Sequence, residues 1–360
     1  MKNILITGGL GFIGSNTCIY LLEKKFKIFI IDSLINSSIE TLKKIKYLNL
    51  QLKNSNKNNL IFFEGDIRDR SIVKKVFQYA LKVNSPIDIV IHLAGLKSVE
   101  ESEKYKKLYW DVNYNGTKNL VEIMEENNCY KLIFSSSATI YGINNSILKE
   151  DSLIKPINTY GKTKFAVEKF AEEKFRSNPK LWNIINLRYF NPIGGHSSGI
   201  LGEVISNKSN NLFPLLCMVA NNDREYLEIY GKDWETPDGT PIRDYIHIED
   251  IAKGHLCAIK YLSKQVKGCS SINLGTGKGT SVLELIKIFE KINNKKINFI
   301  FSKRRKGDVA QYVTSNCLAK NLLKWEAKLS IERMCEDGWK CYISQKNEVE
   351  SFKINKLMKK

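Results

Sequence analysis

The sequence predicts an α/β fold in which a doubly wound parallel sheet is joined to a smaller carboxyl-terminal domain. Two observations support this fold class. Short β-branched segments alternate with amphipathic ones through the first half of the 360-residue chain, as in parallel sheets covered by helices on both faces. A glycine-rich turn joins the first of these strands to the first helix, which is the context of a Rossmann-like dinucleotide-binding turn.

The expected elements follow from this alternation. Strands are expected at 2–7, 26–31, 60–63, 87–92, 131–135 and 182–187, and helices at 12–24, 72–83 and 108–127. Past about residue 190 the pattern loosens, and we expect a strand at 271–274 and helices near 281–293 and 315–325. The Lys- and Asn-rich stretch 51–59 is expected to be a surface loop, and the basic residues 346–360 a frayed tail.

The composition excludes several classes of protein. The formal charge is +18, but the lysines are spread over nearly every helix and stand beside many asparagines, so we expect a compositional bias and no nucleic-acid partner. No apolar run reaches the ~18 residues of a membrane span, and no secretory signal precedes the first strand, so no membrane partner is expected. The eight cysteines lack C-x-x-C spacing, which favours reduced thiols in a cytoplasmic protein and argues against a metal site.

The glycine turn has the spacing G-x-x-G-x-x-G. Gly8 permits the tight turn, Gly11 lets the backbone approach a pyrophosphate, and Gly14 allows the helix to pack closely on the strand. Phe12 and Ile13 open this helix, whose unpaired N–H groups and macrodipole favour anions. The turn is therefore predicted to hold the pyrophosphate of a dinucleotide.

Residues at the ends of the next strands extend this predicted site. Asp32 closes the second strand, where its carboxylate can bind a ribose 2′-OH and would repel a 2′-phosphate, so NAD is favoured over NADP. A helix cap or turn aspartate is the alternative interpretation of this residue. Beyond the third and fourth strands, the expected cofactor contacts are Asp66, Ile67, Leu93, Ala94, Gly95 and Lys97.

Tyr160 and Lys164 stand four residues apart in a helical segment, so they share one face of that helix. A free tyrosine titrates near ~10 and is a poor base at neutral pH. A fixed cation beside it favours the phenolate and moves its pKa toward the working range. Such a pair is common on solvated helix faces, but beside a dinucleotide turn it predicts a tyrosine base with its electrostatic support.

Together these motifs resemble the extended short-chain dehydrogenase/reductase family, and within it the nucleotide-sugar epimerases. The resemblance covers about residues 2 to 345, and it departs from the family pattern at Lys306, which replaces a frequent Glu. Besides the glycine turn it rests on six ordered motifs: AGLK at 94–97, FSSSAT at 134–139, YGKTK at 160–164, LRYFNP at 187–192, RDYIH at 243–247 and RRKGD at 304–308.

The resemblance implies an NAD-dependent enzyme that epimerises UDP-glucose and UDP-galactose reversibly at C4 through a transient 4-keto sugar. Ser137 would donate to the sugar O4, Tyr160 would take the 4-OH proton, and Lys164 would hold the nicotinamide ribose. Ala138 and Thr139 follow Ser137, where related sugar dehydratases carry an Asp-Glu pair. This missing pair favours epimerisation. The alternatives are another nucleotide-sugar epimerase or dehydratase, and a non-catalytic NAD-binding sensor.

The resemblance also implies the remaining contacts. To the cofactor site it adds Asn36, Ser37, Asn113, Ser135 and Phe190. To the UDP-sugar site it assigns Lys97, Asn191, Asn211, Leu212, Glu228, Tyr230, Arg243, Tyr245, Arg305, Asp308 and Tyr312. Among these, Arg243 and Arg305 would grip the diphosphate, and Asp308 would accept a hydrogen bond from the uridine ribose.

The position of Tyr312 bears on substrate breadth. It lies four residues past Asp308, where the family has either a bulky Tyr or a small residue that leaves room for an N-acetyl group, so UDP-N-acetylhexosamines should be largely excluded. The expected organisation is an NAD-binding domain at 1–190, with a returning segment near 245–277, and a mainly UDP-sugar-binding domain at 191–345. A homodimer formed through helices at about 103–128 and 160–176 is expected by resemblance alone.

Overall fold

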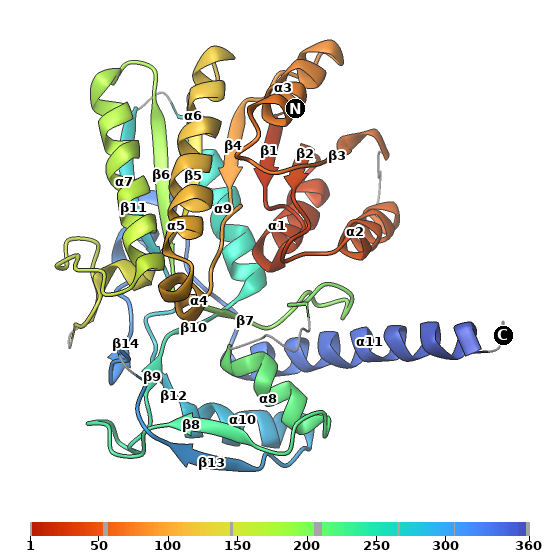
Figure 1. Ribbon diagram of the computed structural model, residues 1–360, viewed down its shortest axis with the longest axis vertical. Coiled ribbons are helices and arrows are strands. Elements are labelled where there is room, and N and C mark those ends of the chain that lie inside the picture. The colour runs from red at the N-terminus through yellow and green to blue at the C-terminus, as the bar shows by residue number, and fades with distance from the viewer. Residues whose placement is uncertain are drawn as a thin grey trace.

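A seven-stranded parallel sheet forms the centre of the computed structural model, which describes residues 2–52, 57–144, 147–204, 211–264, 267–305 and 307–357 (Figure 1). The strand order is β3-β2-β1-β4-β5-β6-β11, and every neighbouring pair runs parallel. The strands are β1 (Asn3–Thr7), β2 (Lys27–Asp32), β3 (Leu60–Glu64), β4 (Ile89–His92), β5 (Lys131–Ser137), β6 (Asn183–Tyr189) and β11 (Gly268–Leu274). With its smaller second lobe, this arrangement confirms the predicted fold class.

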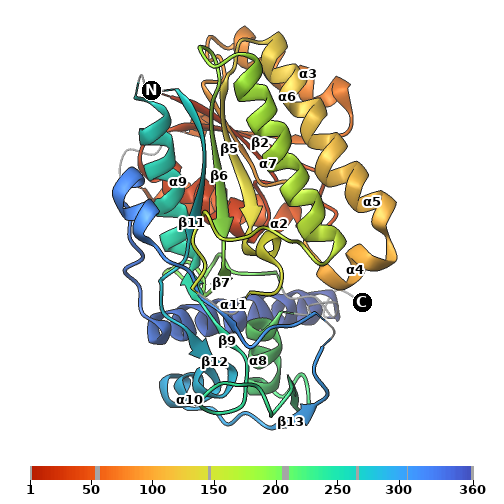
Figure 2. The same cartoon turned by 90° about the vertical axis from the view of Figure 1, so that its left-hand side faces the viewer.

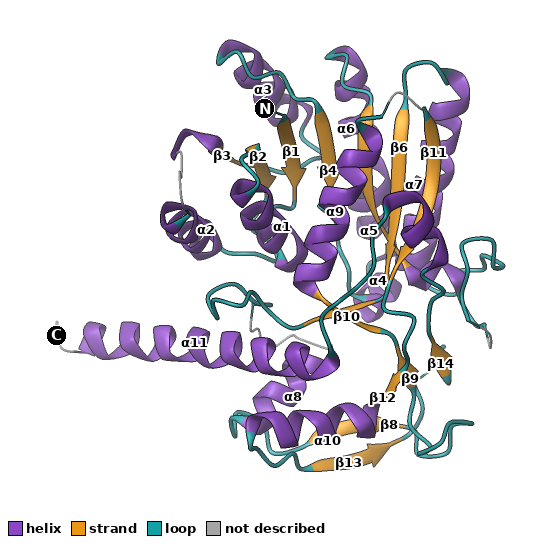
Figure 3. Cartoon of the chain, turned by 180° about the vertical axis from the view of Figure 1, so that it is seen from behind, coloured by secondary structure: helices purple, strands orange, loops and turns teal. Residues whose placement is uncertain are grey.

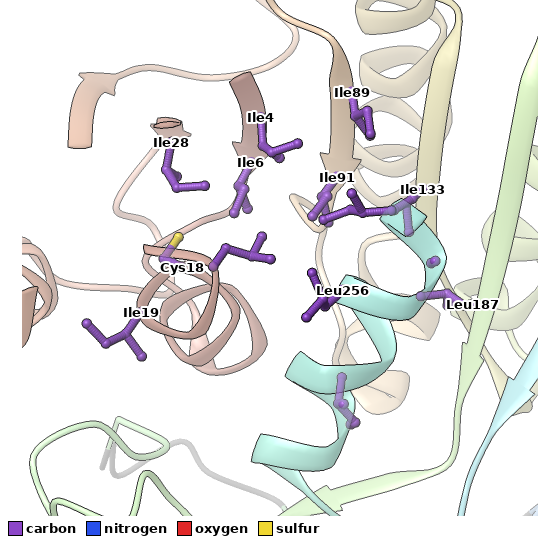
Figure 4. Close-up of a cluster of buried hydrophobic side chains, with 14 of the residues drawn as sticks. Ile4, Ile6, Cys18, Ile19, Ile28, Ile89, Ile91, Ile133, Leu187 and Leu256 are labelled. Carbon is purple, nitrogen blue, oxygen red and sulfur yellow. The ribbon is translucent and has the colours of Figure 1, made fainter. Parts of the chain in front are cut away.

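Helices cover both faces of the sheet. One face packs against α1 (Phe12–Glu23), α2 (Ile39–Gln51) and α9 (Ile248–Leu262). The other packs against α3 (Arg70–Lys82), α6 (Gly116–Glu126) and α7 (Thr159–Ser177) (Figure 2). Figure 4 shows the first of these cores, where Ile4, Ile6 and Ile91 meet Cys18 and Leu256. Burial on both faces is why these strands are near-continuous apolar runs without alternation.

The second lobe is built mostly from later segments of the chain. Its helices are α8 (Leu212–Ala220), α10 (Val282–Asn293) and α11 (Ile331–Leu357), and its two-stranded parallel sheet is β8 (Leu227–Tyr230) with β13 (Phe299–Ser302). Short pairings join the lobes: β7 (Asn191–Ile193) with β10 (Tyr245–His247), and β9 (Ile242–Arg243) with β12 (Thr280–Ser281) and β14 (Gln311–Tyr312). The amino-terminal part of α11 packs in this lobe, and its carboxyl end projects away from the body (Figure 3). No helix in the described part of the chain is long and apolar enough to cross a membrane.

Two of the expectations about irregular segments are wrong. The stretch 51–59 is not a loop throughout, because Gln51 ends α2 and η1 (Lys57–Asn59) is a 3-10 turn, while 53–56 lie outside the described residues. Helix α2 was not expected from the sequence; it follows a serine cap at Ser38 and buries one apolar stripe. The expected tail is helical as far as Leu357, since it continues the docked helix α11.

Two expected helices are altered by π-helical turns. The segment 108–127 is divided into α5 (Lys106–Trp110), the π-turn η2 (Asp111–Asn115) and α6, with α4 (Val99–Lys104) before them. Such a turn adds a residue to the helix and is frequent at functional sites. The segment 315–325 contains only the short π-turn η4 (Ala319–Leu323), which ends at a left-handed residue.

Candidate active site

A cavity of about 550 Å³ opens at the carboxyl ends of the parallel strands and is lined by both lobes. It lies where the strand order reverses between β1 and β4, the place where open α/β sheets bind ligands. The predicted residues that line it are Gly8, Gly11, Phe12, Ile13, Gly14, Asp32, Asn36, Ser37, Asp66, Ile67, Leu93, Ala94, Gly95, Lys97, Ser135, Ser137, Tyr160, Lys164, Phe190, Asn191, Asn211, Leu212, Glu228, Tyr230, Arg243, Tyr245, Arg305 and Asp308.

The glycine turn has the geometry of a phosphate-binding loop. Gly8 has a φ of +69°, and a Cβ there would lie 2.7 Å from Ala94 N, so this position requires glycine. A Cβ on Gly14 would lie 2.3 Å from Gly8 O and would push α1 away from the strand. Gly11 is the N-cap of α1, so the helix has no capping side chain, and its first turn has no acidic residue. Its first N–H groups are therefore left to bind an anion.

Asp32 both holds the turn and faces the cavity. Its carboxylate accepts hydrogen bonds from three donors: Leu10 N (2.9 Å), Leu34 N (3.0 Å) and the Ser37 hydroxyl (2.7 Å). A carboxylate offers about four acceptor positions, so about one is left for a ribose hydroxyl. The two interpretations of Asp32 are therefore compatible: it is a turn aspartate that retains acceptor capacity toward a ligand.

We expect Asp32→Asn to weaken NAD binding by about tenfold, because one hydrogen bond to a charged group is lost. The preference for NAD over NADP should narrow as well, since the charge that repels a 2′-phosphate is gone. Competition binding of the two dinucleotides measures both effects. Glu64→Gln, at the end of the neighbouring strand and outside the cavity lining, is the control. An unchanged NAD-to-NADP preference in Asp32→Asn would contradict the assignment.

α7 and the end of β5 bring the three predicted catalytic groups together. Asn158 caps α7, so the helix starts just before Tyr160. Lys164 Nζ donates to the carbonyl oxygen of Ser135 over 2.7 Å and lies 5.8 Å from the centre of the Tyr160 ring. The Ser137 hydroxyl is close enough to the Tyr160 phenol to lower its pKa. A hydroxyl, a phenol and an ammonium thus face one part of the cavity.

Burial dominates the ionisation of this pair. It raises the pKa of Tyr160 to about 12, while the hydrogen bond with Ser137 lowers it. It also lowers the pKa of Lys164 to about 8. The expectation that Lys164 by itself moves the tyrosine pKa toward neutrality is therefore wrong. The free energy lost when a phenolate is removed from water is larger than the free energy gained from a cation at this distance.

A buried ion pair lies behind these groups. Arg188 on β6 and Glu168 on α7 are 4% and 5% exposed, and the guanidinium contacts both carboxylate oxygens, at 2.7 Å and 3.0 Å. Ser136 Oγ donates to the same carboxylate over 2.5 Å, and Arg188 also donates to the Tyr141 hydroxyl over 2.8 Å. The end of β5 is thereby fastened to α7 next to the catalytic groups.

Two predicted site residues, Asn113 and Tyr312, do not line the cavity. Asn113 lies in the π-turn η2 and is buried, where its side-chain oxygen accepts from Leu96 N over 2.8 Å and supports the loop after β4. The Tyr312 hydroxyl donates to Ala138 O over 2.8 Å, and its ring lies 6.2 Å from the ring of Phe190. Both residues therefore act on the cavity through neighbours that line it.

The second lobe supplies charged groups that are partly paired already. Arg243 forms an ion pair with Asp308 and donates to two backbone carbonyls, so two of its five N–H groups remain for a ligand. The Arg305 guanidinium lies 3.7 Å from the centre of the Tyr230 ring, a stacked cation–π contact. The Tyr230 hydroxyl donates to Glu228 over 2.7 Å. These contacts form a flat, polar end of the cavity with positive charge beside it.

Some cavity residues were missed by the sequence analysis. Glu203 accepts from Lys97 Nζ (2.8 Å) and from Asn211 (2.9 Å), which links the loop after β4 to the second lobe. Tyr189 and Thr139 also line the cavity. Tyr189 lies inside the LRYFNP motif and Thr139 inside the FSSSAT motif, so the sequence could have indicated that both residues belong to the site. Glu203 lies in a loop, outside the motifs quoted above, and only the fold reveals it.

The dinucleotide turn, the tyrosine–lysine pair and the strand-end serine in one cavity define an enzyme of the short-chain dehydrogenase/reductase class. The model of the NAD dependent epimerase/dehydratase family matches residues 4–275, and this chain belongs to that family. The match confirms the expected family and NAD as the expected cofactor.

Relatives of known function are similar over nearly the whole chain. UDP-glucose 4-epimerase 2 of Oryza sativa subsp. japonica is 44% identical over 94% of this chain and 81% of its own length. UDP-glucose 4-epimerase of Bacillus subtilis is 41% identical over 97% of this chain and 99% of its own. Among solved structures, UDP-glucose 4-epimerase from Bifidobacterium longum in complex with NAD+ and UDP has a TM-score of 0.87 and 36% identity, covering 96% of this chain and 99% of its own.

Proposed function

We propose that this chain is an NAD-dependent UDP-glucose 4-epimerase, which interconverts UDP-glucose and UDP-galactose. The observation that carries the proposal is the convergence of Ser137, Tyr160 and Lys164 in a cavity whose other end holds Arg243 and Arg305. Relatives named UDP-glucose 4-epimerase, at 41% and 44% identity over nearly the whole chain, support the same activity.

The residues present fit an NAD molecule. The glycine turn leaves helix N–H groups for its pyrophosphate, and Asp32 retains an acceptor for its ribose. When bound, NAD would supply the reversible oxidation and reduction of C4. Because the reaction has no net change of oxidation state, the cofactor can stay in place through turnover.

This chain's own residues hold and move the proton. Ser137 donates to the sugar O4, and Tyr160 as phenolate takes the 4-OH proton and later returns it. Lys164 keeps a positive charge beside the phenolate. Arg243 and Arg305 hold the diphosphate, so the 4-keto sugar can turn within the cavity while its nucleotide stays bound. These steps account for inversion at C4 without another catalytic base.

The test of the proposed function is incubation of the purified protein with UDP-galactose, with and without added NAD. We expect UDP-glucose to form in both samples. A 4-keto-6-deoxy sugar as the product would identify a dehydratase. Binding of NAD with no conversion of either UDP-hexose would identify a sensor. Either result overturns the proposal.

We expect Tyr312→Cys to admit UDP-N-acetylhexosamines. Removing the phenol frees the volume beside Phe190 and releases two carbonyl contacts at the loop after Ser137. The ratio of kcat/KM for UDP-N-acetylglucosamine to that for UDP-glucose should rise by about tenfold or more, because a steric clash of about 1.4 kcal/mol is relieved. Tyr312→Phe is the control, since it removes only the hydroxyl. If the wild-type protein already converts UDP-N-acetylhexosamines as well as it converts UDP-glucose and UDP-galactose, Tyr312 does not restrict the substrate.

Three further expectations are part of the proposal. A homodimer through the helices at about 103–128 and 160–176 is supported by apolar side chains exposed at the start of the first segment, among them Tyr105, Leu108 and Trp110; sedimentation of the purified protein tests it. A cytoplasmic location is supported by eight cysteines that form no disulfide. The division into domains near residue 190 remains a prediction, although β11 does return to pair with β6.

A further inference from the structure

The catalytic Ser137 has two hydrogen bonds with a single neighbour, Thr139. The backbone N–H of Thr139 donates to Ser137 Oγ over 3.3 Å, and Thr139 Oγ1 lies 3.0 Å from the same oxygen. Ser137 is the cap of the 3-10 turn η3 (Ala138–Tyr141), which explains the first contact. The second contact is not required by the turn. Thr139 also lines the cavity.

The direction of these hydrogen bonds follows from the number of donors. A serine hydroxyl has one proton and two lone pairs. The backbone N–H can only donate, so it takes one lone pair of Ser137. The neighbouring Ser137 hydroxyl lowers the pKa of Tyr160, and a phenolate at Tyr160 can only accept a hydrogen bond. The single proton of Ser137 is then directed to Tyr160, and the Thr139 hydroxyl donates to the second lone pair of Ser137.

We propose that Thr139 is a positioning residue that fills both lone pairs of Ser137. The serine can then only donate its single proton, either to the Tyr160 phenolate or, once Tyr160 is protonated, to the sugar O4. The proposal rests on the proposed function, because it assigns a direction to the proton path of that reaction. Its consequence concerns the neutral form of Tyr160. A phenol cannot donate to a serine whose lone pairs are both occupied, so the Ser137–Tyr160 hydrogen bond favours the phenolate.

Other titratable groups lie on the elements packed around Tyr160 and its partner Lys164. Lys164 lies on α7, and Tyr189 faces Tyr160 from β6. His92 on β4 is kept neutral because burial lowers its pKa to about 3. Glu103 on α4 accepts from the backbone N–H of Thr159 over 2.6 Å. A change at Thr139 leaves these side chains in place, so its effect on Tyr160 can be separated from theirs.

The experiment is a phenolate absorbance titration of the NAD-loaded protein, with Tyr160→Phe as the blank. We expect Thr139→Val to raise the Tyr160 midpoint by about half to one pH unit, because one neutral hydrogen bond no longer favours the phenolate. At pH values below this midpoint kcat should fall by about three- to tenfold, with KM unchanged. Thr139→Ser keeps the hydroxyl and should restore both quantities. Thr139→Ala repeats the test without the added methyl group.

Matched controls separate this role from a structural one. Thr41→Val changes a buried threonine in α2, outside the cavity lining, and should leave the Tyr160 midpoint unchanged. An unchanged midpoint in both Thr139→Val and Thr139→Ala, or failure of Thr139→Ser to restore it, overturns the proposal. A wild-type protein that titrates as described but does not epimerise UDP-galactose would overturn the proposed function instead. The titration therefore distinguishes the two failures.

Discussion

Replacing Tyr160 with Phe should lower kcat for UDP-galactose epimerisation by about 10³-fold while NAD remains bound. Positioned acid–base groups contribute typically about 10²–10⁴-fold, and the phenol oxygen is the group that exchanges the 4-OH proton. The ring of Phe fills the same buried volume, so the stability of the fold should change little. A coupled assay of UDP-glucose formation measures kcat, and the absorbance of the extracted dinucleotide measures NAD content.

The comparison variant for this result is Tyr189→Phe. Tyr189 lines the same cavity, but its hydroxyl is hydrogen-bonded to His255 Nε2 over 2.8 Å. If Tyr160 is the base, Tyr189 exchanges no proton with the substrate. We expect its loss of kcat to be far smaller than that of Tyr160→Phe. If the two variants lose activity equally, or if Tyr160→Phe keeps most of its activity, Tyr160 is not the base.

Arg188→Met should destabilise the fold by about 3–5 kcal/mol, the typical cost of removing one partner of a buried ion pair. Glu168 is 5% exposed and would be left with a buried charge that, among the described residues, keeps hydrogen bonds from Ser136 and Ser271. Urea unfolding followed by fluorescence measures the free energy of unfolding. The midpoint should move to lower urea with the same slope, because the surface exposed on unfolding does not change.

Two further variants test the cause of this loss. Arg176→Met breaks the exposed pair with Glu172, whose side chains are 72% and 44% accessible, and should cost less than about 1 kcal/mol. The double variant Arg188→Met with Glu168→Leu should recover part of the stability, because no buried charge is left unpaired. If the double variant is as unstable as Arg188→Met alone, the loss comes from packing and not from the orphaned carboxylate.

The sequence predicted those parts of the site whose residues are close together in the chain, within one turn or one helix. Gly8, Gly11 and Gly14 are close in the chain, and their spacing is tied to one local geometry. Tyr160 and Lys164 share a helix face by periodicity alone. Asn113 and Tyr312 were assigned to the site by resemblance, yet neither is among the residues that line the cavity. Whether a residue lines the cavity or supports a loop beside it depends on tertiary packing. A local sequence pattern holds no information about that packing.

The helices that were missed or altered have physical causes beyond the local sequence. α2 forms at a polar stretch because one apolar stripe is buried against the sheet. The π-turn η2 interrupts a helix whose pattern reads as continuous, and Asn113 in that turn binds the loop after β4. In both cases tertiary contacts outweigh propensity.

The sequence by itself determined the fold class, the dinucleotide turn and the family, because strand and helix periodicity and glycine spacing are local properties. Only the tertiary structure decided what surrounds the reacting groups. Burial, and not the neighbouring lysine, dominates the pKa of Tyr160. Residues far apart in the chain meet at Arg188–Glu168 and Lys97–Glu203, since parallel strands bring distant segments to one edge. The environment of a charge depends on every element packed around it, which is why it emerges only in the folded chain.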